Sequence, residues 1–223
     1  MDTRVPAPGA SPRLRASAML LALLAAALDA QAYTIAITAG SRTLYLQVGV
    51  GSSLGAVLAG GGLPPNNSTV NQVSVTVPAA GSGSGTPYAM ATDSPVSNSP
   101  YDDFAGYCTP TVNGEVYVGG FFRVPGAGAG AAATLTVTAP PNLVSASGAT
   151  LPFSEIEWTS AGLEDVTPTI PSGRFPGTGA TSTLLSVARN TWFESCLAFR
   201  YLNTRLVPGG TYSGRAVYTL TAP

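Results

Sequence analysis

Histidine and lysine are both absent from this chain of 223 residues, whose ten basic residues are all arginine. Only 9% of the residues are charged, against about 25% in a typical globular protein. The chain therefore has no imidazole for acid–base catalysis or metal ligation, no Schiff-base lysine and no P-loop lysine. A net charge of −1, with the arginines scattered along the chain, also argues against nucleic-acid binding. We expect a protein that is not an enzyme and that carries no cofactor.

Long hydrophobic runs are also lacking. The one sustained apolar stretch, Met19–Leu28, is shorter than the roughly 20 residues that span a bilayer. Three arginines precede this stretch, and Ala30 and Ala32 after it form the small-x-small pattern of a signal-peptidase site. The pattern predicts a signal peptide at residues 1–32 and a single exported domain at residues 33–223, with no membrane span in that domain. A buried N-terminal helix is the alternative interpretation.

Cysteine is scarce, and its two copies are Cys108 and Cys196. Because an even number of cysteines in an exported protein is typical of disulfides, we predict a bridge between Cys108 and Cys196. Two thiols without a histidine do not make a structural zinc site, so no metal site is expected. A nucleophilic cysteine would also lack its usual imidazole base.

Short runs of alternating or β-branched residues, separated by turn residues, fill the rest of the chain. They predict an all-β fold, namely an antiparallel immunoglobulin-like β-sandwich of about nine or ten strands. The predicted strands are Tyr33–Ala39, Thr43–Val48, Val73–Val77, Tyr107–Val112, Glu115–Val124, Ala133–Thr138, Pro152–Thr159, Thr181–Val187, Thr191–Tyr201 and Tyr212–Thr221.

Three segments have specific local patterns. Asn113-Gly114, between two of these runs, is a strong signal for a β-hairpin turn. Leu54–Leu58 is a candidate for a short helical turn. The segment Leu184–Phe199 fits helical spacing as well as strand spacing, so both interpretations stay open.

Two sets of side chains are candidates for chemistry or binding. Glu155 and Glu157 lie two apart on a predicted strand, which directs both carboxylates to one face about 7 Å apart. This spacing resembles the acid–base pair of a glycosidase, although a solvated strand face is the more ordinary interpretation. Aromatic rings can form a ligand platform, while core packing is the expected role of both tryptophans. The aromatic candidates are Tyr88, Tyr101, Tyr107, Tyr117, Trp158 and Trp192.

The C-terminal segment has a recognisable pattern. It begins with Pro208-Gly209-Gly210-Thr211-Tyr212, in which Gly210 is the fourteenth residue counted from the end. It then alternates small or polar residues with Tyr212, Gly214, Ala216, Tyr218 and Leu220. This pattern resembles the C-terminal strand of chaperone–usher pilus subunits and of the related spore-coat-U-like secreted domains.

That resemblance implies an incomplete immunoglobulin-like sandwich. A periplasmic chaperone first supplies the missing strand, and the N-terminal extension of the next subunit then replaces it. Tyr33–Ala39, with Tyr33, Ile35 and Ile37, is by this resemblance the donor strand. The assembly strand that the chaperone reads contains Gly210, Tyr212, Ala216, Tyr218 and Leu220.

Three functions follow as hypotheses. The leading one is a structural subunit of an extracellular fimbria or surface filament, assembled with like subunits and a chaperone and usher by donor-strand exchange. The alternative is a self-complete secreted β-sandwich that binds a glycan or a surface, as an adhesin does, and it predicts an exposed aromatic patch. The third is a hydrolase that uses Glu155 and Glu157, and it predicts that both are partly buried.

Overall fold

The parts of the chain that the computed structural model describes are residues 43–56, 71–126, 130–163 and 169–223. They all belong to one compact unit, Ala39–Pro223. The predicted signal peptide and the predicted donor residues Tyr33, Ile35 and Ile37 lie outside the described residues. In the described parts, no helix has the length and apolar composition needed to cross a bilayer.

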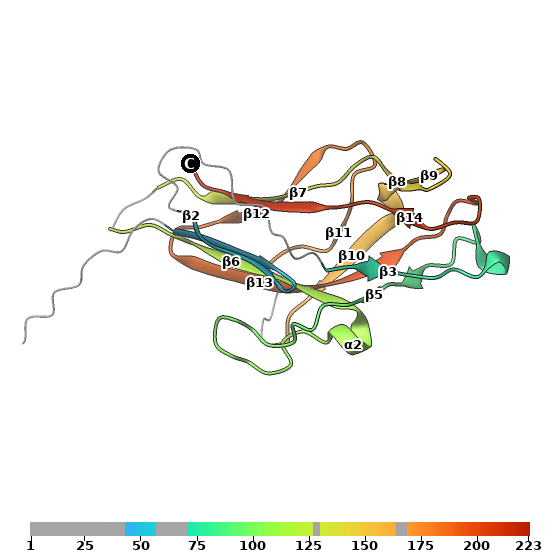
Figure 1. Cartoon of the computed structure of the whole chain (residues 1–223). Helices are drawn as coiled ribbons and strands as arrows, with labels where there is room; N and C mark the ends of the chain where they lie inside the picture. Colours follow the sequence, from blue (N-terminus) through green and yellow to red (C-terminus); the bar gives the residue numbers. More distant parts are fainter. Residues whose placement is uncertain (1–42, 57–70, 127–129, 164–168) are drawn as a thin grey trace, which may run out of the picture. The chain divides into compact units, whose positions relative to one another are not determined.

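The larger sheet is antiparallel and forms one layer of the fold (Figure 1). Its strands follow the order β11-β10-β13-β6-β1-β2, and β4 pairs with the end of β13. The bounds of these strands are β1 Thr43–Val48, β2 Gly51–Ala56, β4 Tyr88–Ala89, β6 Glu115–Arg123, β10 Ile156–Ala161, β11 Gly173–Arg174 and β13 Thr191–Tyr201.

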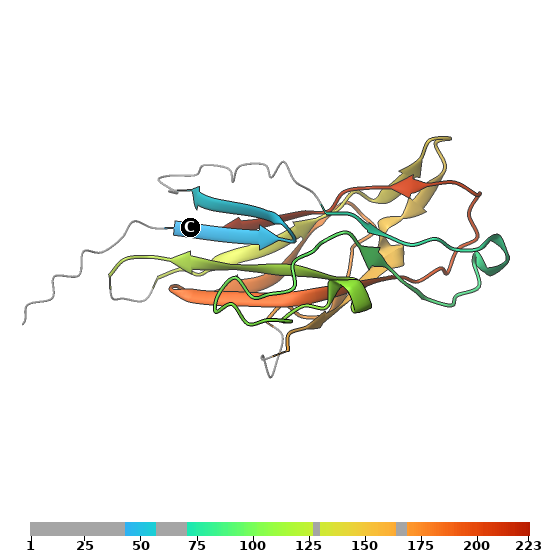
Figure 2. The same cartoon turned by 60° about the horizontal axis from the view of Figure 1, so that its bottom comes forward.

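Three strands in the order β12-β7-β15 form the second layer, and the two sheets pack as an antiparallel β-sandwich (Figures 1 and 2). Their bounds are β7 Ala133–Thr138, β12 Thr181–Val187 and β15 Val217–Thr221. The remaining elements are β3 Val73–Ser74, β5 Ala91–Thr92, β8 Asn142–Ser145, β9 Thr150–Pro152, β14 Tyr212–Ser213, the short helix α2 Pro110–Asn113, and the 3₁₀ turns η1 Ala79–Gly81 and η2 Phe153–Glu155.

Alternation along the strands explains how the two layers share a core. In β7 the side chains of Ala133, Leu135 and Val137 are buried, while the threonines between them are half-buried. Phe193 and Leu197 of β13 face the same core from the larger sheet. Full burial of an aliphatic side chain of this size stabilises a fold by about 1.5–3 kcal/mol. The prediction of an all-β antiparallel sandwich is therefore confirmed.

Several predicted strands have the predicted bounds. They are Thr43–Val48, Ala133–Thr138, Thr181–Val187 and Thr191–Tyr201. The segment Leu184–Phe199, whose periodicity was ambiguous, belongs to β12 and β13 with a turn between them, and so it is not a helix.

The predicted hairpin turn at Asn113-Gly114 is wrong. Residues Pro110–Asn113 form the one-turn helix α2, and Gly114 ends it with a φ of 65°. The N–H group of Gly114 donates a hydrogen bond to the carbonyl oxygen of Pro110 (3.1 Å). Proline at the first helical position and a left-handed glycine after the last one favour a helix over a β-turn. The predicted strand Tyr107–Val112 is consequently absent.

Three other predicted elements differ from the structure. Leu54–Ala56 lies in β2 rather than in a helical turn, and the rest of that candidate is outside the described residues. The predicted strand Val73–Val77 is shortened to β3. The predicted strand Tyr212–Thr221 is divided, because its first part, β14, pairs with β8 and its second part, β15, pairs with β7.

Candidate functional site

The predicted assembly residues are spread over the C-terminal segment. Gly210 lies in a bend, and Tyr212 begins β14, where its hydroxyl donates a hydrogen bond to the carbonyl oxygen four residues earlier (2.7 Å). Ala216, Tyr218 and Leu220 pack against the main core. Burial raises the pKa of Tyr218 above that of a free phenol. Only Tyr218 and Leu220 of this set lie on β15.

β15 is one of the two end strands of its sheet in the part of the chain that the structure describes, and β12 is the other. β15 pairs antiparallel with β7 from Val217 and Thr138 to Thr221 and Thr134, and with no other described strand. It runs close to β1 of the larger sheet without forming a ladder with it. The side chain of Val217 is 45% exposed. Because an end strand can present N–H and C=O groups to a further strand, β15 is a candidate edge for strand pairing among the described strands.

A long loop folds back over the outer face of the larger sheet and is tied there by a disulfide. Cys108 in this loop is bonded to Cys196 of β13, with Cα atoms 5.5 Å apart and a sequence separation of 88. The predicted bridge is therefore confirmed. Tyr107 and Cys108 pack with Tyr117 of β6 in a second buried cluster. Since the neighbours of Tyr117 on β6 face the main core, this cluster lies on the opposite side of the sheet.

Three successive outward positions of β13 hold this loop by three different contacts. Cys196 forms the disulfide, and Glu194 accepts a hydrogen bond from the hydroxyl of Ser99, which lies 2.9 Å from each carboxylate oxygen. The ring of Trp192 stacks on that of Tyr101, with centroids 5.2 Å apart. Side chains two residues apart on a strand point to the same face, which is why the three contacts follow one line along β13.

Glu194 is a buried carboxylate, 8% exposed, and its side-chain donors are neutral. Besides Ser99, the hydroxyl of Tyr117 donates a hydrogen bond to it (2.8 Å). Burial, followed by the hydrogen bond to Glu194 and the charge of that residue, raises the pKa of Tyr117 far above that of a free phenol. Tyr117 therefore keeps its proton and remains a donor to Glu194 throughout the physiological pH range.

Three neighbouring strands place aromatic rings together on the same outer face. Tyr45 of β1 pairs in register with Phe121 of β6, and Phe121 pairs with Trp192 of β13. The three ring centroids lie 5.6 to 5.8 Å apart, and the ring planes are inclined by 22° to 30°. Tyr101, which is 65% exposed, covers Trp192 from the loop. We call these four residues the aromatic cluster.

Two residues of this cluster, Trp192 and Tyr101, were among the six aromatic candidates for a ligand platform. Tyr45 and Phe121 were missed because their meeting depends on strand register. Trp158 is buried in the main core, as expected, and its indole N–H donates to a backbone carbonyl oxygen (3.0 Å). Trp192 lies outside that core, so the expected core role is wrong for it. The other predicted tyrosines lie elsewhere, Tyr88 on β4 and Tyr107 and Tyr117 in the second buried cluster.

The predicted carboxylate pair does not lie on one strand. Glu155 is buried in η2 and accepts hydrogen bonds from the backbone N–H and the hydroxyl of Thr204 (2.8 and 2.6 Å). Glu157 lies on β10, where it forms an ion pair with Arg200. The strand begins only at Ile156, since Pro152 and the 3₁₀ turn after it delay the extended backbone. Each carboxylate is thus engaged by partners of its own.

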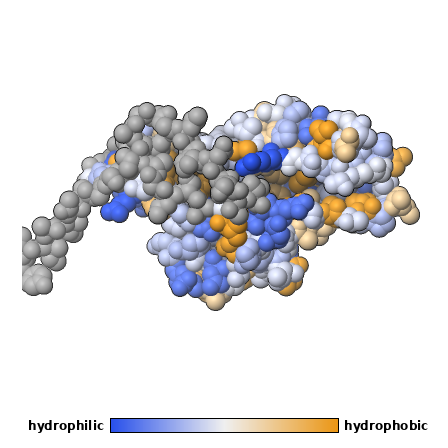
Figure 3. Space-filling view, viewed as in Figure 1, coloured by the Kyte–Doolittle hydropathy of each residue, from blue (hydrophilic) through white to orange (hydrophobic). Residues whose placement is uncertain are grey.

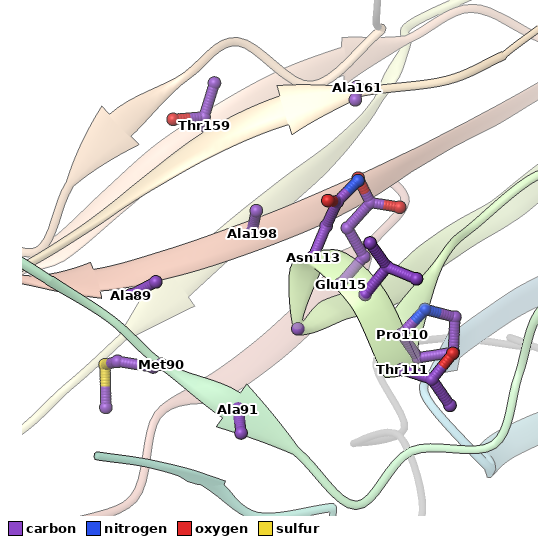
Figure 4. Close-up of a pocket in the computed structure, with 12 residues that line it drawn as sticks. Ala89, Met90, Ala91, Pro110, Thr111, Asn113, Glu115, Thr159, Ala161 and Ala198 are labelled. Carbon is purple, nitrogen blue, oxygen red and sulfur yellow. The ribbon is translucent and has the colours of Figure 1, made fainter. Parts of the chain in front are cut away.

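A groove of about 490 Å³ lies beside α2, within the size range of small-molecule sites. Figure 4 shows small side chains on one side of it, with Asn113 and Glu115 together on the α2 side. Glu115 accepts hydrogen bonds from the backbone N–H and hydroxyl of Thr109 (2.6 and 3.1 Å) and from the amide of Asn113 (3.1 Å). The small side chains that line the groove are Ala89, Ala91, Thr159, Ala161 and Ala198.

Large exposed hydrophobic side chains are spread over several elements of the described structure. On the face shown in Figure 3, hydrophobic residues lie in small groups between hydrophilic ones. Isolated apolar side chains of this kind are ordinary on a protein surface. They are Val50, Tyr101, Val112, Val144, Leu163, Leu206 and Val217.

Comparisons of the chain with protein-family models, with curated proteins and with solved structures returned no match.

Proposed function

We propose that this protein is a structural subunit of an extracellular fimbria or surface filament that is assembled by exchange of β-strands between chains. The observation that carries the proposal is the edge of β15, which pairs with β7 alone among the described strands. An incoming strand gains main-chain hydrogen bonds at such an edge, and its alternate side chains set the register.

The segment that fits this edge is Tyr33–Ala39 of another copy of the chain. Its residues alternate, with Tyr33, Ile35 and Ile37 on one face and threonine or alanine on the other. A strand paired with β15 would direct the first set toward the main core, to which Leu220 belongs. Before assembly, a periplasmic chaperone would cover the same edge, and the leader at residues 1–32 would direct export.

The test uses a full chain that can accept a strand but cannot donate one. The variant Ile35→Asp with Ile37→Asp is expected to remain monomeric in light scattering, while the parent chain polymerises slowly. A synthetic peptide spanning Tyr33–Ala39 is expected to stabilise the variant, by about 2.7 kcal/mol at a concentration of 100 times its dissociation constant.

Two control peptides separate strand pairing from simple apolar adsorption. One carries the same Ile→Asp changes, and the other keeps all side chains but has alternate backbone amides methylated. Neither is expected to raise the unfolding temperature of the acceptor variant. A parent chain that stays monomeric, unfolds cooperatively and ignores the peptide would contradict the filament proposal.

A second candidate function, a self-complete secreted module that binds a glycan, is favoured by the aromatic cluster. Near-parallel rings that are partly exposed, such as Tyr101 over Trp192, are the kind of surface on which the apolar face of a sugar packs. Calorimetric titration with a panel of soluble oligosaccharides tests this function. Tyr101→Ala is expected to abolish binding and Tyr88→Ala, outside the cluster, to leave it unchanged; equal binding by both variants would refute it.

A further inference from the structure

A buried carboxylate lies beside the disulfide. Glu115, at the start of β6, is 6% exposed, and no described arginine lies within ion-pair distance of it. Its two oxygens are held by Thr109 and Asn113, which together supply three hydrogen bonds. These neutral donors fix the direction of the carboxylate without neutralising its charge. A buried anion that lacks a cationic partner is a suitable ligand for a metal ion.

The sulfur atoms complete a set of three donors. One oxygen of Glu115 and the sulfurs of Cys108 and Cys196 all lie within 4.8 Å of one another. In the disulfide the sulfurs are not available to a cation. As thiolates, two sulfurs and one carboxylate oxygen match the ligands that Zn²⁺ takes in proteins, and water can fill a fourth position. No metal site was expected from the sequence: the turn of α2 brings Glu115 back to Thr109, next to Cys108, and the pairing of β6 with β13 brings it to Cys196.

We propose that Cys108, Cys196 and Glu115 hold one borderline-soft divalent cation such as Zn²⁺ before the disulfide forms. Binding to the reduced chain releases the two thiol protons. A disulfide-containing oxidant then takes two electrons from the two thiolates and two protons from solvent and becomes a dithiol, which leaves the protein disulfide and the free cation. The cation and the disulfide are thus alternative ties between the loop and β13. This proposal is independent of the filament function.

The matched control is Glu194, the other buried carboxylate on this face. Its oxygens accept hydrogen bonds from Ser99 and Tyr117, and it does not belong to the three-donor group. Removing the charge of Glu194 therefore changes the buried electrostatics of the same face without removing a metal ligand.

The experiment uses Cd²⁺ as the probe, because its bonds to thiolates give an ultraviolet charge-transfer band. The full chain is unfolded, reduced with a trialkylphosphine and refolded without oxygen while Cd²⁺ is titrated against a competing chelator. We expect one Cd²⁺ per chain and slower disulfide formation on addition of an oxidant. Glu115→Gln is expected to weaken binding at least about tenfold, since even partners outside the ligand set are worth about 10–100-fold. Glu194→Gln is expected to leave the affinity unchanged.

A further variant keeps the test decisive if Glu115→Gln does not fold. Glu115→Asp retains a carboxylate and is expected to bind more tightly than Glu115→Gln and more weakly than the parent. The proposal is overturned if the reduced parent shows no charge-transfer band. It is equally overturned if all three variants bind Cd²⁺ as tightly as the parent, which would indicate a bare dithiol site.

Discussion

Removing the disulfide is expected to lower the stability of the fold by several kcal/mol. The bridge closes a loop with a sequence separation of 88. On the chain-entropy relation, a cross-link of this length lowers the entropy of the unfolded chain enough to stabilise the fold by about 4.6 kcal/mol at 25 °C. The double variant Cys108→Ala with Cys196→Ala should therefore lose about this amount. Alanine is the right replacement because both sites are buried, where a serine hydroxyl would need a partner.

The loss is measured by urea unfolding and by calorimetry. For a compact unit such as Ala39–Pro223, each kcal/mol shifts the unfolding temperature by about 2–4 °C, which predicts a decrease of about 9–18 °C. The slope of free energy against urea should also rise, because an unfolded chain without the bridge exposes more surface.

Ser99→Ala provides the comparison, since it removes another tie of the same loop without changing the connectivity of the unfolded chain. It should cost about 1.5–3 kcal/mol, the range for a hydrogen bond to a charged group, with an unchanged slope. A double cysteine variant that loses less than about 2 kcal/mol, also with an unchanged slope, would refute the reasoning from the unfolded state.

Three further predictions concern single residues. The free energy of unfolding should fall as the pH rises above about 10, because tyrosine ionises in the unfolded chain whereas the raised pKa of Tyr117 keeps its proton on in the fold. In urea titrations, Tyr117→Phe should make this decrease with pH less steep, by up to about 1.4 kcal/mol per pH unit. Gly114→Ala should lower the free energy of unfolding more than Gly85→Ala. Both glycines have positive φ, but a Cβ at Gly114 would lie 2.0 Å from a backbone carbonyl oxygen, whereas a Cβ at Gly85 would meet open space. Chemical denaturation should show a loss of about 1–2 kcal/mol for Gly85→Ala, and an equal loss for the two variants would contradict this steric account. Asn203→Ala should lower the free energy of unfolding by about 2–3 kcal/mol and speed amide exchange in residues 81–86. The reason is that the buried Asn203 side chain forms hydrogen bonds with Gly81, Gly83, Ser84 and Thr86. Unchanged exchange would show that Asn203 does not hold this segment.

The sequence contained enough to predict the long strands but not how they meet. Ala133–Thr138 and Thr191–Tyr201 were predicted with their observed bounds, since turn residues flank a clear alternation. The predicted hairpin turn at Asn113-Gly114 was wrong because Pro110 favours the start of a helix there, and the left-handed Gly114 ends that helix four residues later. Pro110 and Gly114 both stand in the sequence at the spacing of a one-turn helix, whereas the left-handed φ of Gly114 is known only from the structure.

The candidate sites depend on information that a single sequence does not contain. Alternation alone places Trp192, Glu194 and Cys196 on one face of a strand. Ser99 and Tyr101 lie in a loop without periodicity, and their contacts with that face are set by how the loop folds over the sheet. Strand register likewise decides which aromatic rings become neighbours. The disulfide was predictable because the chain has only two cysteines.

The disulfide also determines how the chain would respond to force. A chain pulled from its two ends transmits the load through the Cys108–Cys196 bond, so the residues between them, which include β6, β7 and β12, are shielded from the pull. An extended residue spans about 3.3–3.6 Å. Locking a separation of 88 residues therefore shortens the greatest extension of the chain by roughly 300 Å. Under tension, a molecule built this way is drawn out only from the parts outside the bridge, because the enclosed residues do not carry the load.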